Sequence, residues 1–177
     1  MRIALTLAAV IVSAAAVVSV GAQSAAGLRW TVPAGWTTAP AQPMRAATYA
    51  IAPATGDKAP AECGVYFFGA GQGGSVSDNI DRWKGQFHSP DGKPAAATVG
   101  KKTVRGLNIT TIETSGEYSG MAGPMVNSRP VPGYSLLGAI VEGPGGNVFV
   151  KFTGPSTTVA ANRTKFDALL NSFQNHS

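Results

Sequence analysis

The chain has 177 residues, 44% hydrophobic and 13% charged, which fits a single globular domain. Fourteen Lys and Arg residues against nine Asp and Glu give a formal net charge of +5, but no stretch concentrates this charge as nucleic-acid binding requires. Two histidines and one cysteine exclude a structural zinc site, and Cys63 has no partner for an intramolecular disulfide. We therefore predict no metal, cofactor or nucleic-acid ligand, and a buried Cys63, with an intermolecular disulfide or a reactive thiol as the alternatives.

The first 22 residues have the pattern of an export signal. Arg2 precedes an apolar run over residues 3–20 that ends in small residues. This pattern predicts a signal peptide cleaved after Ala22 or after Ala26, followed by one globular domain over residues 27–174. A retained membrane anchor is the alternative, because the run is about long enough to hold one. The mature protein is expected to be periplasmic or secreted, with weak membrane-surface association still open.

The densest structural signal follows Cys63. Residues 65–68 are β-branched or aromatic, which predicts a buried strand, and a glycine-rich turn over 69–74 follows. Ser75 and Asp78 have the spacing of a capping box, so a helix should begin here. Its apolar stripe is Val76, Ile80, Trp83 and Phe87, and its polar face is Asp78, Asp81, Arg82, Lys84 and Gln86.

The turn matches the dinucleotide-binding pattern G-x-G-x-x-G at Gly69, Gly71 and Gly74. The acidic residue that such a site needs at the end of a second parallel strand is missing, and no further strand–helix alternation follows. We interpret the glycines as residues that allow a tight turn close to the sheet.

The remaining chain reads mainly as strands. A short strand is predicted before the turn over residues 32–35. Further strands are predicted at 44–51, 98–104, 107–114, 134–142 and 148–153, the last two as a hairpin with a five-residue loop over 143–147. A last helix should start at Ser156 or Thr157 and end near Phe173, leaving Asn175 to Ser177 frayed. Antiparallel strands interrupted by two main helices indicate an α+β fold.

The long loop over residues 116–133 is the best candidate for a contact surface. It is rich in glycine and proline and contains adaptable side chains. The candidate partner contacts are Tyr118, Met121, Met125 and Arg129 in this loop, with Gly71 and Gln72 from the glycine-rich turn. Met121 and Met125 could equally cap the core.

Three segments resemble the Mog1/PsbP-like α/β/α sandwich proteins, in particular small exported bacterial members with no assigned activity. They are the opening Trp30-Thr31-Val32-Pro33-Ala34-Gly35-Trp36, the strand start Met44-Arg45, and the close Lys151-Phe152-Thr153-Gly154-Pro155 with Phe166-Asp167-Ala168-Leu169-Leu170-Asn171-Ser172-Phe173. The resemblance implies a mostly antiparallel sheet with two main helices packed on it, and a non-enzymatic scaffold that binds another protein. It supplies no catalytic residues.

The sequence contains no coherent catalytic set. Our leading hypothesis is an exported, non-catalytic binding or accessory protein of the cell envelope, whose partner is another envelope protein. One alternative is a carrier of a lipid or small apolar ligand, which needs a cavity near Trp83 and Phe87. A small hydrolase using His88 with a serine or glutamate is the other.

Overall fold

The structure is a computed structural model that describes residues 22–120 and 129–176. The strands are β1 (Ala22–Ala25), β2 (Leu28–Thr31), β3 (Thr37–Thr38), β4 (Arg45–Ile51), β5 (Ala61–Tyr66), β6 (Phe87–His88), β7 (Ala97–Val104), β8 (Leu107–Tyr118), β9 (Val131–Gly143), β10 (Gly146–Pro155) and β11 (Gln174–Asn175). The helices are α1 (Val76–Lys84), α2 (Ser156–Ala161) and α3 (Arg163–Ser172). Nearly all of the predicted export signal therefore lies outside the described residues.

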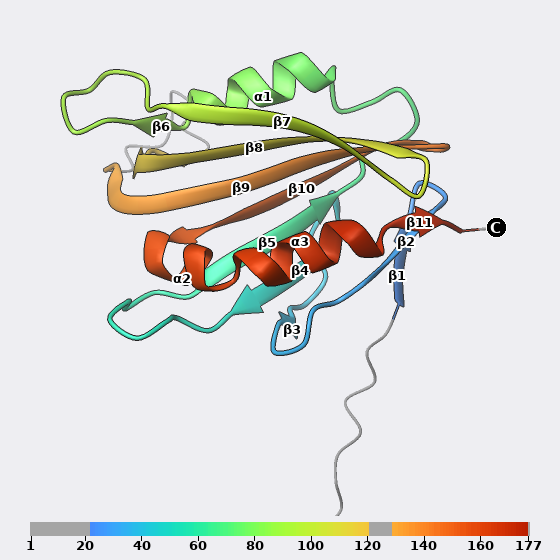
Figure 1. Ribbon diagram of the computed structural model, residues 1–177, viewed down its shortest axis with the longest axis horizontal. Coiled ribbons are helices and arrows are strands. Elements are labelled where there is room, and N and C mark those ends of the chain that lie inside the picture. Colours follow the sequence, from blue (N-terminus) through green and yellow to red (C-terminus); the bar gives the residue numbers. More distant parts are fainter. Residues whose placement is uncertain (1–21, 121–128, 177) are drawn as a thin grey trace, which may run out of the picture.

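A large antiparallel sheet forms the middle layer. Its strands run in the order β3-β4-β5-β10-β9-β8-β6, and β7 also pairs with β8. Figure 1 shows α1 on one side of this sheet and α2 and α3 on the other. The predicted α+β class with a mostly antiparallel sheet is confirmed.

A second, smaller sheet joins the two ends of the described chain. Its order is β1-β2-β11, and all its pairs are antiparallel. The prediction that residues 175–177 fray is wrong for Asn175, because Asn175 pairs with Leu28 in β11. The backbone N–H of His176 also donates to the Gly27 carbonyl at 2.8 Å.

Strand alternation creates a hydrophobic core on each face of the large sheet. On β10, Val148, Val150 and Phe152 enter the core beneath α3, while Phe149 enters the core beneath α1. Cys63 belongs to the larger core and is fully buried, as predicted. Burial raises the pKa of the Cys63 thiol, which makes it unreactive.

The helix α1 begins as predicted and ends earlier. The Ser75 hydroxyl accepts from the Asp78 N–H, and the Asp78 carboxylate accepts from the Ser75 N–H, which completes the capping box. The helix ends at Lys84, so Phe87 is not part of its apolar stripe and lies in β6 instead. Gln86 was expected on the exposed helix face but is buried, because the chain turns inward after Gly85.

Several other boundaries differ from prediction. The strand expected at 65–68 lies at 61–66, and the loop expected over 116–133 is shorter because β8 and β9 extend into it. The β9–β10 connection is a two-residue turn, Pro144-Gly145, rather than a five-residue loop. The last helix is two helices divided at Asn162, and no side chain caps the start of α2. Within the described ranges, no helix is long and apolar enough to cross a membrane.

A candidate binding surface around Lys151

The strand β10 places a lysine where its neighbours are core residues. Alternation puts Phe149, Lys151 and Thr153 on the α1 face of the large sheet. Phe149 is buried there, whereas Lys151 keeps part of its surface in contact with solvent. A charged side chain therefore continues the row that Phe149 begins.

Neutral groups hold the Lys151 ammonium. Its Nζ donates to Oε1 of Gln86 at 2.6 Å and to the Tyr118 hydroxyl at 3.1 Å, and it lies 5.2 Å from the centre of the Tyr118 ring. The Gln86 carbonyl accepts from the N–H and the hydroxyl of Ser119, which ties the segment after α1 to the end of β8. These contacts bring three separate segments together around one cation.

The electrostatic surroundings are unfavourable for this charge. Burial is the main cause that lowers the pKa of Lys151, to about 8. The positive charges of Arg82 and Arg45 lower it further, while Glu62 acts in the opposite direction. No carboxylate within the described ranges forms an ion pair with Lys151.

A β-bulge turns Arg45 toward the same face. The register of β4 against β5 shifts between Arg45 and Ala47, so that Arg45 lies opposite Tyr66. Arg45 pairs with Glu62 at 2.6 Å, and its guanidinium lies 5.2 Å from the centre of the Tyr66 ring. Strict alternation would have put Arg45 on the opposite face, together with the buried Tyr49.

Half-exposed aromatic rings complete the surface. Tyr118 and Tyr134 stack with centroids 5.8 Å apart and an interplanar angle of 3°, and Tyr66 stacks on Phe68 at 6.1 Å. Burial raises the pKa of the Tyr66 and Tyr118 hydroxyls, so both stay neutral donors. We call the following residues the Lys151 surface: Arg45, Glu62, Tyr66, Gln86, Tyr118, Tyr134 and Lys151.

The predicted contact residues lie in different parts of the structure. Tyr118 belongs to the Lys151 surface, while Arg129 is exposed beside the undescribed segment. Gly71 and Gln72 are exposed in the turn between β5 and α1, which contributes no residue to this surface. Met121 and Met125 lie outside the described residues.

Sequence reasoning missed most of the surface. One signal was available: Lys151 interrupts the apolar run Val148 to Phe152, where a charge has no reason to lie in a plain core strand. Nothing local marked Arg45, Tyr66 or Tyr134, because the bulge and the strand pairing bring them together.

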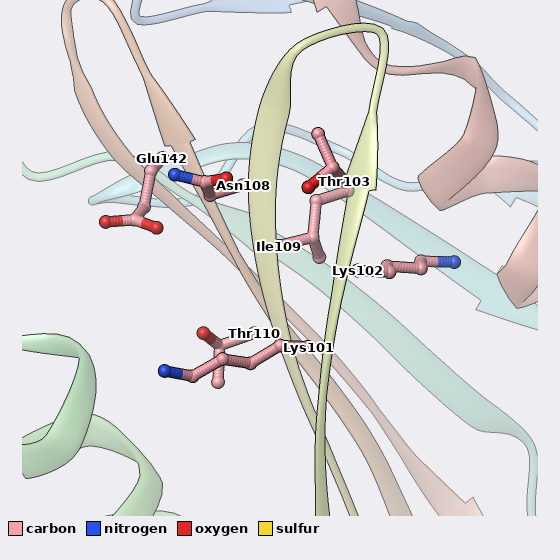
Figure 2. A pocket seen from close by; sticks show the side chains of 7 residues that line it. All are labelled: Lys101, Lys102, Thr103, Asn108, Ile109, Thr110 and Glu142. Atoms are coloured by element: carbon pink, nitrogen blue, oxygen red, sulfur yellow. The ribbon is translucent and has the colours of Figure 1, made fainter.

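A hollow lies elsewhere, near the turn between β7 and β8. It measures about 360 Å³ and is lined by Lys101, Lys102, Thr103, Asn108, Ile109, Thr110 and Glu142. Figure 2 shows Lys101 and Glu142 on one side of this hairpin and Lys102 on the other. Lys101, Asn108 and Glu142 are exposed, so this is an open polar depression rather than a ligand pocket.

The two alternative functions find little support in this geometry. The Trp83 ring occupies the space between α1 and β9, since a Cβ at Gly138 would lie 2.7 Å from it. The His88 ring forms no hydrogen bond to a serine or a glutamate within the part of the chain that the structure describes. Within that same part, no three His, Cys, Asp or Glu side chains gather closely enough to hold a metal ion.

Comparison with known proteins identifies the fold. No protein-family model matches the sequence, and no curated protein is similar to it in sequence. The solution structure of cyanobacterial PsbP (CyanoP) from Synechocystis sp. PCC 6803 superposes with a TM-score of 0.54, over 94% of this chain and 99% of that one, at 14% identity. The chain has the PsbP fold. The predicted Mog1/PsbP-like architecture is therefore confirmed.

Proposed function

We propose that this protein is an exported, non-catalytic accessory protein of the cell envelope, which binds another envelope protein through the Lys151 surface. The observation that carries the proposal is the composition of that surface: half-exposed Tyr66, Tyr118 and Tyr134 surround the cations Arg45 and Lys151. Tyrosine and arginine are the residues enriched at the energetic centres of protein interfaces.

Two further observations support the proposal. The leader pattern over the first 22 residues supports export to the periplasm or beyond the cell. The PsbP fold supports an accessory role, because the resemblance implies a non-enzymatic scaffold. The function itself depends on the site and not on the fold.

Site-specific photo-cross-linking in the producing cell tests this proposal. A benzophenone amino acid replaces Tyr134 on the Lys151 surface or, as the control, Thr164, which is exposed on α3 at the opposite side of the sheet. We expect a discrete protein adduct from position 134 and none from position 164. Absence of an adduct at both positions, or the same adduct at both, would contradict the proposal.

A further inference from the structure

The Lys151 ammonium has an unused hydrogen-bond donor. A lysine carries three N–H donors, and two of them go to Gln86 and Tyr118. No acceptor for the third lies within residues 22–120 and 129–176. The nearest acidic group of the surface, Glu62, is paired with Arg45 instead.

The surface also carries more positive than negative charge. The positive charges of Arg45 and Arg82 both act on Lys151, and the Glu62 carboxylate acts against them. Arg82 donates to the Asn79 side chain rather than to an acid. A partly buried charge without a counter-ion is costly unless a partner supplies one.

The segment that follows Tyr118 contains no residue that could act as the counter-ion of Lys151. Residues 119–130 connect β8 to β9 beside Tyr118 and contain no Asp or Glu. A negative charge beside Lys151 would therefore have to come from other parts of the chain, where the described acids form no ion pair with Lys151, or from a second molecule.

We propose that the Lys151 surface binds an acidic segment of the partner protein, with one carboxylate side chain accepting the third Lys151 N–H. A single free lysine donor matches a monoanionic carboxylate better than a phosphate, which takes several donors at once. The rings of Tyr66, Tyr118 and Tyr134 then cover the apolar stem of the incoming side chain. The claim that a partner protein supplies the carboxylate rests on the proposed function. The claim that Lys151 binds a carboxylate does not.

A matched pair of peptides tests the site on the unaltered protein. The probes are acetyl-alanyl-glutamyl-alanine amide and its glutamine counterpart, which differ in charge and hardly in shape. The readouts are the affinity from NMR titration and the pKa of Lys151 from its side-chain resonances. We expect the glutamate peptide to bind roughly tenfold more tightly and to raise the pKa of Lys151 by about one unit at saturation.

Two variants separate this site from general charge attraction. Lys151→Met should abolish the preference for the glutamate peptide, whereas Lys101→Met, which removes an exposed lysine at the β7–β8 hollow, should leave it intact. Equal affinity for both peptides, an unmoved pKa, or a preference that survives in Lys151→Met would overturn the inference. If Lys151→Met fails to fold, the affinities of the two peptides for the unaltered protein still test the inference.

The two proposals can fail separately. A discrete adduct at Tyr134 together with equal peptide affinities would leave the partner-binding function and remove the carboxylate site. A glutamate preference without any adduct would leave the carboxylate site and remove the protein partner.

Discussion

The Trp83 ring of α1 lies directly against the backbone of Gly138 in β9. A Cβ at position 138 would lie 2.7 Å from Cζ3 of Trp83 and 2.8 Å from Cγ2 of Ile112, both of them buried side chains. Gly138 thus allows α1 to approach the sheet, and this contact anchors the helix whose end leads to Gln86.

Gly138→Ala should therefore destabilise the protein. Neither neighbour can move without disturbing the core, so we expect a loss of about 1–3 kcal/mol in the free energy of unfolding. Urea unfolding measures it. The control is Gly85→Ala at the end of α1, where φ is −64° and the new Cβ would lie 3.5 Å from the nearest atom. Similar unfolding midpoints for the two variants would show that α1 can shift freely on the sheet.

Thr153→Val should stabilise the protein. The Thr153 hydroxyl is buried and has no hydrogen-bond partner among the described residues. Valine has nearly the same shape and removes the unsatisfied group, so the free energy of unfolding should rise by about 1 kcal/mol. Thr114→Val is the matched control, because the Thr114 hydroxyl donates to the Ala96 carbonyl at 2.9 Å. Loss of this hydrogen bond should lower the free energy of unfolding. A destabilised Thr153→Val would mean that the hydroxyl has a partner after all.

Lys151 should make stability depend on pH in the alkaline range. Its folded pKa of about 8 lies below the value of about 10.4 for an unfolded lysine, so between these values the unfolded chain binds more protons. Its contribution to the free energy of unfolding therefore rises with pH from about 8 and is lost as pH falls through the folded pKa.

The Lys151→Met variant isolates this contribution. Relative to the variant, the unaltered protein should gain about 2 kcal/mol between pH 7 and pH 9.5, measured by denaturant unfolding at each pH. Cys63 also makes stability depend on pH, because its raised pKa lowers the free energy of unfolding as pH rises in this range. Both proteins contain Cys63, so its contribution cancels in the difference between them. The charged and titratable groups that face Lys151 are Arg45, Arg82, Glu62, Tyr66 and Tyr118. Burial raises the pKa of the Tyr66 and Tyr118 hydroxyls, which keeps both neutral in the folded protein in this window. A constant difference across the range would show that Lys151 is solvated.

Export processing should leave residues 23–25 of β1 in the mature protein. Ala22–Ala25 pairs with β2, and the Gly145 N–H donates to the Ala26 carbonyl at 3.0 Å in the turn between them. Cleavage after Ala26 would remove this strand, so we expect N-terminal sequencing of the mature protein to begin at Gln23. A chain starting at Gly27 should unfold at lower denaturant than one starting at Gln23. Mature protein that begins at Gly27 with equal stability would contradict this.

Local chemistry was enough to predict most of the elements. The capping box at Ser75 and Asp78, the apolar runs of the strands predicted at 134–142 and 148–153, and the two-residue gap between the strands predicted at 98–104 and 107–114 depend on neighbours within a few residues. The structure has a capping box, a hairpin of β9 with β10 and a hairpin of β7 with β8 at these places. The burial of Cys63 followed from the apolar strand around it. These features determine an α+β domain whose sheet is antiparallel.

Tertiary structure alone decided the surface. The bulge at Arg45, the inward turn that buries Gln86 and the pairing of β5, β10, β9 and β8 bring the members of the Lys151 surface together from six segments of the chain. Such contacts depend on register, and a shift of one residue turns a side chain to the other face of a sheet. The sequence by itself shows a lysine in an apolar strand. Only the paired strands show that its charge has no counter-ion among the described residues.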